Sequence, residues 1–374
     1  MLSRPLILLL SVVCSGVLAT PTAIKIPILK HAGKVKENSY IIQLKSEASK
    51  SAHLSHLPKS GLDISYTYDQ VFHGYAARLD SNILEYIQQS NDVAAIFEDG
   101  IITTDIAQPI LKSDNTGPLS RSNPNLENIR RANPADVDVY DIGTGIYTAH
   151  TAFGGRAHWG ATFGGYKNAD GNGFSTCIAG IAVGATYGVA TQANVYAVKG
   201  MSLTTLSDAG SGTISDLVAA INWVISAVAT SGRPSLIMLS AVVSANSALD
   251  TAAVSAINSG IHFIVPVPLS SLDPVNNSPA RVPAVITVGI EGRQYSLITD
   301  VCSKGTAVTC PSIEGPTATR MLSGSAIAMA RVAGIVAAVI GTYGNSSPAS
   351  IAAQLRAHAS KSNFNVCPVI NDRW

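Results

Sequence analysis

Apolar positions along the first third of the chain follow two periods and predict a small α+β unit. Residues 40–44 alternate like a strand, and the polar stretch 46–57 is compatible with a helix. We expect a hairpin over 64–79, a helix that starts at a capping residue over 81–90, and a returning strand over 93–98. Two strand groups, each followed by a helix, favour one sheet covered by one layer of two helices.

From residue 137 onward, short apolar strands alternate with longer helical patterns, which is typical of a parallel sheet with helices on both faces. The expected strands cover residues 137–140, 193–199, 236–242, 262–267 and 284–289. The expected helices cover residues 174–183, 213–228, 248–259, 326–342 and 347–359. The larger block is therefore predicted to be an α/β domain with a central parallel sheet.

Polar residues and prolines separate the two blocks. Residues 106–135 contain four prolines and runs of Ser, Asn and Arg, a composition that predicts a linker rather than a packed element. We place the small unit at residues 20–107, the linker at 108–135 and the large domain at 136–374.

The N-terminus has the layout of a secretory signal peptide. Arg4 precedes the apolar run 6–13, and small residues follow as far as Ala19. We predict a signal peptide over residues 1–19 and a protein that is secreted or resides in the secretory pathway. A buried helix of the folded protein is the alternative, although the run is short and terminal. No later stretch reaches the ~18 uninterrupted apolar residues of a membrane span, so we expect a soluble mature protein.

Composition limits the partners that the protein can have. The chain has 374 residues, 47% of them hydrophobic and 13% charged, which provides enough apolar material for two packed domains. The formal net charge is +1, and no block of Lys and Arg stands out. These values argue against nucleic acid and against an anionic membrane as partners.

Cysteines and sequons fit an oxidising, secretory environment. Cys302 and Cys310 are close enough in sequence for a disulfide that closes a loop, whereas Cys177 lies in an apolar helix and is as well explained as a free buried thiol. No cysteine has metal-ligand spacing with histidine, and we assign no metal and no cofactor. Asn276 and Asn345 begin candidate glycosylation sequons, with Pro279 lowering the odds of the first.

The stretch 321–337 contains the strongest functional signal. A turn of small residues over 323–326 runs straight into an apolar helix, an arrangement that lifts a side chain to the base of a cleft. The stretch resembles the nucleophile segment of the subtilisin-like serine proteases, Gly-Thr-Ser-Met-Ala-x-Pro-His-Val-Ala-Gly. Ala326 stands at the position that matches the serine, and a methyl group cannot attack a carbonyl.

Most of the chain shares this resemblance, which is closest to the proteinase K-like branch of secreted fungal enzymes. The matching stretches, in the family's order, are 137–140 with 144–146, then 153–157, 187–190, 193–199, 210–213, 258–263 and 278–281. The segment 72–79 resembles the inhibitory propeptide of these proteases, which acts as a folding template and fills the active-site cleft. The resemblance implies a subtilisin-like three-layer α/β fold with a central parallel sheet, preceded by a small ferredoxin-like α+β propeptide domain.

The same register implies that the catalytic residues are missing. The family's catalytic aspartate position is Gly143, with Asp141 two residues earlier and roughly 6.5 Å along the strand, too far to replace it. The motif Asp-Gly-x-Gly-His-Gly-Thr-His-x-Ala-Gly matches residues 170–180 with Phe174 at the catalytic histidine. The asparagine that stabilises the oxyanion is replaced by Leu269, which has no hydrogen-bond donor.

The two walls of the implied cleft differ in how many of the family's residues they retain. Val242 and Val243 replace the two glycines that let a substrate backbone approach closely. The opposite wall, Gly210, Ser211 and Gly212, retains the family's residues. A narrowed cleft is therefore expected.

Four interpretations of this pattern are open. The leading one is a secreted homologue without proteolytic activity that binds its own propeptide, another peptide, a protein or a small molecule. The others are a non-hydrolytic catalyst acting on a small molecule in an apolar cleft, a serine endopeptidase rewired around Ser175 or Ser325, and a decaying duplicate. Because the chain cannot cut itself in the first case, we expect residues 20 to about 107 to stay attached unless another protease acts.

Overall fold

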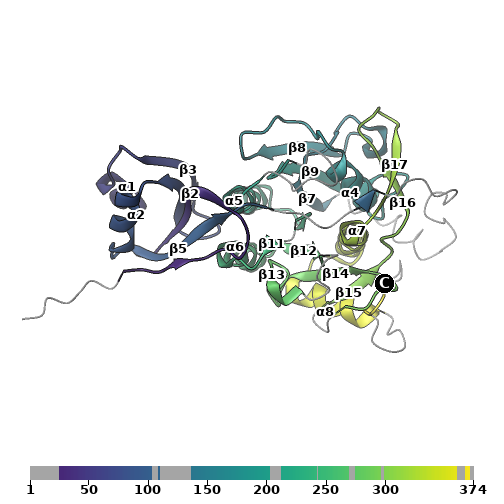
Figure 1. Cartoon of the computed structure of the whole chain (residues 1–374). Helices are drawn as coiled ribbons and strands as arrows, with labels where there is room; N and C mark the ends of the chain where they lie inside the picture. The colour runs from purple at the N-terminus through teal and green to yellow at the C-terminus, as the bar shows by residue number, and fades with distance from the viewer. Residues whose placement is uncertain are drawn as a thin grey trace, which may run out of the picture.

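The structure, a computed structural model, describes residues 25–102, 108–109, 136–202, 212–241, 243–268, 274–295, 299–359 and 367–370. The expected signal peptide and nearly all of the expected linker lie outside these ranges. Within them the chain forms a small N-terminal unit and a larger α/β unit that pack side by side (Figure 1).

The small unit is a five-stranded sheet with two helices on one face. Its strand order is β1-β5-β2-β4-β3, and every pair is antiparallel except β1 with β5. The elements are β1 (Ile28–Leu29), β2 (Val35–Leu44), α1 (Lys50–His56), β3 (Leu62–Tyr68), β4 (Gly74–Leu79), α2 (Ser81–Gln88) and β5 (Val93–Gly100). The helix α2 starts where the Asp80 carboxylate accepts hydrogen bonds from two backbone N–H groups. The α+β unit predicted from the sequence is confirmed.

A seven-stranded parallel sheet forms the centre of the large unit. Its strand order is β15-β14-β12-β10-β7-β9-β8, and each neighbouring pair is parallel. The strands are β7 (Asp138–Gly143), β8 (Ala157–Thr162), β9 (Asn194–Lys199), β10 (Ser235–Leu239), β12 (His262–Pro266), β14 (Ile286–Ile290) and β15 (Val301–Ser303). The edge strands β8 and β15 were not predicted from the sequence; each is short or mixed in polarity, and β15 is only three residues long.

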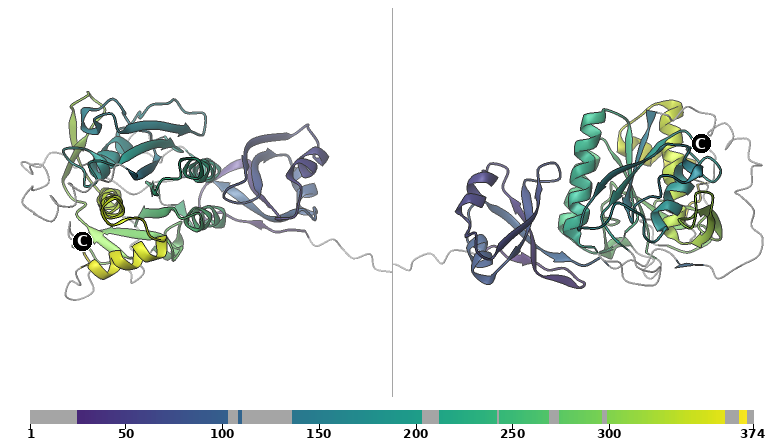
Figure 2. Two further views of the ribbon diagram at one scale, coloured as in Figure 1. Left: turned by 180° about the vertical axis from the view of Figure 1, so that it is seen from behind. Right: turned by 90° about the horizontal axis from the view of Figure 1, so that it is seen from above.

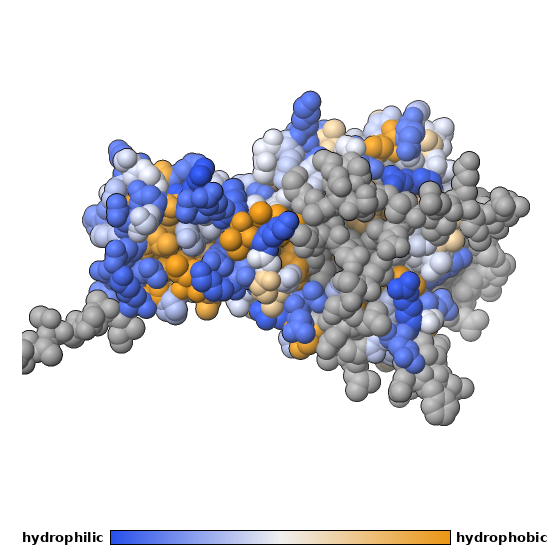
Figure 3. All heavy atoms as spheres, in the orientation of Figure 1, coloured by the Kyte–Doolittle hydropathy of each residue, from blue (hydrophilic) through white to orange (hydrophobic). Residues whose placement is uncertain are grey.

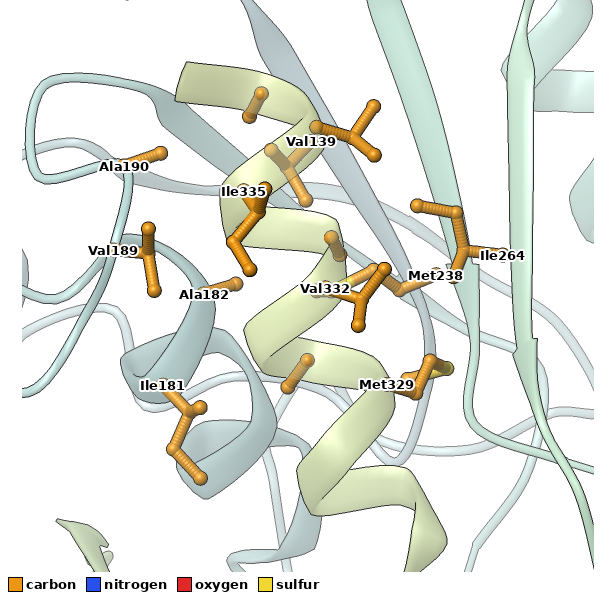
Figure 4. Close-up of a cluster of buried hydrophobic side chains, with 14 of the residues drawn as sticks. Val139, Ile181, Ala182, Val189, Ala190, Met238, Ile264, Met329, Val332 and Ile335 are labelled. Atoms are coloured by element: carbon orange, nitrogen blue, oxygen red, sulfur yellow. The ribbon is translucent and has the colours of Figure 1, made fainter. Parts of the chain in front are cut away.

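Helices cover both faces of this sheet, as expected for parallel strands (Figure 2). On one face lie α4 (Phe174–Val183) and α7 (Ser325–Tyr343), and on the other lie α5 (Ile214–Ser231) and α6 (Ser247–Asn258). The helix α8 (Pro348–His358) completes the C-terminal part. Figure 4 shows the first face, where side chains of α7 such as Val332 pack against α4 and against Met238 and Ile264 of the sheet.

Shorter strands form two small sheets outside the parallel sheet. They are β11 (Val243–Ser244) with β13 (Asn277–Ser278), and β16 (Val308–Pro311), β17 (Thr319–Ser323) and β6 (Gln108–Pro109) in a three-stranded sheet. Single turns η2 (Thr151–Phe153) and η3 (Pro274–Asn276) complete the assignment. The predicted strand 236–242 ends at Leu239, because Val243 leaves the parallel sheet to pair with Ser278.

The predicted cysteine chemistry is wrong. Cys177 of α4 is bonded to Cys310 of β16, and Cys302 of β15 is bonded to Cys367 near the C-terminus. The Cys302–Cys310 pair and the free thiol at Cys177 are therefore both excluded. The short sequence spacing was misleading, because Cys302 lies in the large parallel sheet and Cys310 in the sheet that packs against α4.

Most large apolar side chains are buried inside the two units. By length and composition α5 and α7 are apolar enough to cross a membrane, but 56% and 89% of their apolar windows are buried within the protein, as in core helices. Figure 3 shows a mixed polar surface with apolar areas on the small unit. Leu29, Val35 and Ile64 are exposed apolar side chains of this unit. Scattered exposed apolar side chains of this kind are normal for folded proteins.

Candidate functional site

The three positions singled out by the sequence lie where one strand ends and two helices begin. Gly143 is the last residue of β7, Phe174 is the first residue of α4, and Ala326 is the second residue of α7. The helices α4 and α7 pack against each other, and Phe174 and Ala326 belong to one buried apolar cluster. A hydrogen atom, a benzyl ring and a methyl group stand at these positions, and none of them can transfer a proton.

Ser175 fills the space beside Gly143. A Cβ atom placed on Gly143 would lie 2.0 Å from the Ser175 Oγ and 3.5 Å from the Asp141 Oδ1. The backbone N–H of Thr144 donates to the Ser175 Oγ at 2.9 Å, and the Ser175 N–H donates to the Thr144 Oγ1 at 3.1 Å. No side chain larger than glycine's fits at position 143 while Ser175 is in place.

Asp141 is a second polar group of this corner. Its side chain is 1% exposed, and its Oδ1 accepts a hydrogen bond from the Ser240 hydroxyl at 3.2 Å. Burial raises the pKa of the Asp141 carboxyl to about 8, although hydrogen bonds from Ser175 and Ser240 act in the opposite direction. The group is thus largely neutral near pH 7, unlike the ionised carboxylate that orients a catalytic histidine.

Asp170 fixes the loop that leads into α4. Its Oδ1 accepts from the Gly173 N–H and from the Thr144 hydroxyl, each at 2.9 Å, and its Oδ2 accepts from Thr176 N–H and Oγ1 at 3.0 and 2.6 Å. A carboxylate at this place satisfies N–H groups that a helix start leaves without partners. The end of β7 and the start of α4 are therefore held together by side-chain hydrogen bonds.

The serines next to the key positions are inaccessible. Ser175 and Ser325 are both 0% exposed, and the Ser325 hydroxyl has no hydrogen-bond partner among the residues that the structure describes. A nucleophile needs a base within hydrogen-bond reach and a path for substrate. Neither hydroxyl meets both requirements in this arrangement.

Two short stretches that follow the small unit pair with two different segments of the large unit. Ile101 forms an antiparallel bridge with Thr213, and the Ile102 N–H donates to the Gly212 carbonyl at 3.0 Å. Farther along, β6 pairs antiparallel with Leu322 and Ser323 at the end of β17, directly before α7. The chain therefore contacts both the segment at Gly212 and Thr213 and the strand that leads to Ala326.

The sheet of the small unit packs on α5 and α6 (Figure 1). Tyr66 and Tyr68 of β3 donate hydrogen bonds from their hydroxyls to the Asp216 Oδ1 at 2.7 Å and to the Ser215 carbonyl at 3.1 Å. The Asn222 side-chain oxygen accepts from the backbone N–H groups of residues 69, 70 and 71. Polar contacts thus surround an apolar interface.

Asp99 sits at the centre of this interface. Its carboxylate is 0% exposed and accepts hydrogen bonds from Ser39 of the small unit and from the backbone and hydroxyl of Ser215 on α5. Burial raises the pKa of the Asp99 carboxyl. Separating the small unit from the large one would expose Asp99, which belongs to β5, and leave Ser215 at the start of α5 without this acceptor.

The remaining predicted site residues are only partly described. Gly210, Ser211, Val242 and Leu269 lie outside the described residues, while Gly212 is buried and Val243 is 2% exposed within the apolar layer under α6. Within the described ranges no group of three or more His, Cys, Asp or Glu could hold a metal ion.

The sequon asparagines are both exposed. Asn276 lies in η3, and Asn345 lies in the turn after α7, where its Oδ1 contacts the His262 Nε2 at 2.9 Å. Sequence reasoning missed the part played by Ser175 and Asp170 in building the corner. Ser175 stands where the family's histidine motif has a glycine, directly after Phe174, and this replacement was the signal that could have identified it.

Comparison with known proteins agrees with this architecture. Residues 39–105 match the family model described as Peptidase inhibitor I9. The chain is 33% identical over 300 residues to Subtilisin-like protease 2 of Pseudogymnoascus destructans, covering 76% of this chain and 72% of that protein. It is 28% identical over 324 residues to Proteinase R of Parengyodontium album, covering 83% and 81%.

Other relatives are longer than this chain, and a solved structure supports the fold. The chain spans 58% of Subtilisin-like proteinase Spm1 of Pyricularia oryzae, at 30% identity. The crystal structure of a cold adapted subtilisin-like serine proteinase matches with a TM-score of 0.58 and 26% identity, over 71% of this chain and 94% of that one. The chain belongs to the subtilisin-like serine protease family, with an I9-type propeptide domain at its N-terminus.

Proposed function

We propose that this protein is a secreted subtilisin-like protease homologue that does not hydrolyse peptides. The observation that carries the proposal is the set of side chains at the triad positions: Gly143, Phe174 and Ala326, with Leu269 at the oxyanion position. None of the three triad positions offers a nucleophile, a base or an acid.

Energetics support this proposal. Loss of the nucleophile or the base alone removes on the order of 10⁶ in turnover, and the residual rate depends on the oxyanion hole and on substrate binding. This chain lacks all three groups and the oxyanion donor, and Val242 replaces a glycine of the family's substrate-binding strand. We therefore expect hydrolysis near the uncatalysed background.

We further propose that the remaining function of the cleft is to bind an extended peptide, in the first place the chain's own junction after the propeptide. Antiparallel pairing of Ile101 with Thr213, and of β6 with β17, supports it. Main-chain hydrogen bonds of this kind give affinity for an added strand whatever its side chains. Because no self-cleavage is available, the propeptide stays covalently attached unless another protease removes it.

Secretion is part of the same proposal. The signal-peptide pattern over residues 1–19 supports it, and so do two disulfides, which persist in oxidising compartments. Glycosylation at Asn276 or Asn345 stays a prediction that accompanies secretion.

The test is incubation of the purified secreted protein with an unfolded protein substrate and, separately, with an active-site-directed fluorophosphonate. We expect neither fragments nor labelling, while an active relative such as Proteinase R gives both under the same conditions. Labelling of any serine in the wild-type chain would overturn the proposal.

N-terminal sequencing tests the attached propeptide. We expect an N-terminus near Thr20 when the protein is secreted by cells that lack other secreted proteases. A new N-terminus between residues 103 and 136 that the purified protein generates by itself would contradict both the attached propeptide and the missing activity.

A further inference from the structure

The corner around Gly143 is rebuilt rather than empty. If a carboxylate side chain had simply been lost from the end of β7, the structure would contain a cavity beside Gly143. Instead the Ser175 Oγ lies only 2.0 Å from the place where a Cβ on Gly143 would stand. Close-packed interiors do not accommodate two atoms at this separation.

The hydroxyl that fills the space is also bonded in place. It accepts from the Thr144 N–H at 2.9 Å, while Thr144 Oγ1 accepts from the Ser175 N–H at 3.1 Å. The Thr144 hydroxyl in turn donates to the buried Asp170 at 2.9 Å. Ser175 is 0% exposed, so its removal would leave the Thr144 N–H without this acceptor in a dry environment.

Asp141 extends the same cluster to a third element. Its Oδ1 lies 3.5 Å from the point that a Cβ on Gly143 would occupy, and it accepts from Ser240 just after β10. The Ser175 hydroxyl also lowers the pKa of this carboxyl, against the larger effect of burial. The cluster of Asp141, Ser175 and Ser240 therefore joins β7, α4 and the segment after β10 at one point.

We infer that Ser175 fills the space beside Gly143 and acts as a positioning residue that now excludes any side chain at 143. This inference rests on the proposed loss of activity and deepens it: the site has been remodelled around glycine at 143. Restoring the three triad residues alone cannot rebuild a catalytic corner while Ser175 remains.

A double-mutant cycle tests the exclusion. Gly143→Ala is expected to lower the unfolding temperature by several degrees, because its methyl group meets the Ser175 Oγ. The same substitution in a Ser175→Ala background is expected to cost little, since the blocking oxygen is gone. Gly171→Ala, where a Cβ meets nothing within 4 Å, is the matched control. An equal loss from Gly143→Ala in both backgrounds overturns the inference.

The pH dependence of unfolding gives a second test, because Asp141 titrates beside Ser175. Ser175→Ala removes a hydroxyl that lowers the pKa of Asp141, so the pH range over which unfolding depends on Asp141 is expected to move upward. Ser175→Thr keeps the hydroxyl and is expected to leave that range unchanged. An unchanged pH profile in Ser175→Ala means that Ser175 does not position Asp141, and contradicts the inference.

Restoring the three triad residues tests the inference through reactivity rather than stability alone. We expect G143D/F174H/A326S to be destabilised and not labelled by a fluorophosphonate, and the addition of Ser175→Gly to recover the unfolding temperature. Labelling at position 326 in the triple variant would overturn the inference.

The proposed function is overturned by a different result, the labelling of the wild-type chain, so the two hypotheses can be tested separately. If the triple variant does not fold, recovery of folding by Ser175→Gly is the deciding measurement.

Discussion

At the scale of single residues, Asp141 couples protonation to folding. Its carboxyl has an ordinary pKa near 3.8, and burial raises the pKa to about 8 in the folded protein. Between these two values the folded state binds more protons than the unfolded state. The contribution of Asp141 to stability is therefore present below about pH 4 and is lost as the pH rises toward 8.

We predict that Asp141→Asn flattens this dependence. In the wild-type protein the free energy of unfolding is expected to fall between about pH 5 and about pH 8, by at most about 1.4 kcal/mol per pH unit from this group. The variant, which cannot titrate there, is expected to lose that slope. Urea unfolding at several pH values measures it, with the exposed Asp136→Asn as control. Parallel curves for wild type and Asp141→Asn would refute the assignment.

At the scale of elements, two disulfides connect parts of the fold that are far apart in sequence. The Cys177–Cys310 bond spans 133 residues and ties α4, which carries Phe174, to β16. The Cys302–Cys367 bond spans 65 residues and ties β15 to the C-terminal segment. Only the first of these bonds constrains a helix that borders the candidate site.

We predict that C177A/C310A loses about 2–5 kcal/mol of unfolding free energy, because the unfolded chain regains the freedom that the bond removes. Amide exchange within residues 174–183 is expected to rise as well. C302A/C367A serves as the control, with a loss of stability but unchanged exchange in α4. Peptide mapping without reduction checks the pairing, and a peptide that joins Cys302 to Cys310 would contradict the structure.

At the scale of the whole molecule, the small unit acts as a covering layer for α5 and α6. The interface combines apolar contacts of aromatic side chains of β3 with hydrogen bonds, among them those that the buried Asp99 accepts. The same unit delivers residues 101 and 102 to the Gly212 wall. Docking of the unit and the pairing of residues 101 and 102 with Thr213 and Gly212 are consequently parts of one arrangement.

We predict that Asn222→Ala loosens this docking at one place. The variant removes the oxygen that accepts from the N–H groups of residues 69–71. Amide exchange there is expected to rise between about twofold and about tenfold, since a hydrogen bond contributes roughly 0.5–1.5 kcal/mol. Ser226→Ala, on an exposed position of the same helix, is the control. Unchanged exchange at 69–71 would show that Asn222 does not hold the small unit.

The sequence by itself determined the class of fold and most of its elements. Apolar periodicity is a local property, so the strand at β12 and the helix at α7 were predicted within one or two residues of their observed bounds. Residue identity also decides what chemistry is absent, because Phe174 and Ala326 cannot transfer a proton in any conformation.

Only the tertiary structure decided which groups meet. The disulfide partners, the pairing of β6 with β17 and the contact between Ser175 and Gly143 join residues 32 to more than 200 positions apart, and no local pattern encodes such proximity. The raised pKa of Asp141 has the same origin, because burial is produced by the elements packed around the carboxyl and not by its neighbours in sequence.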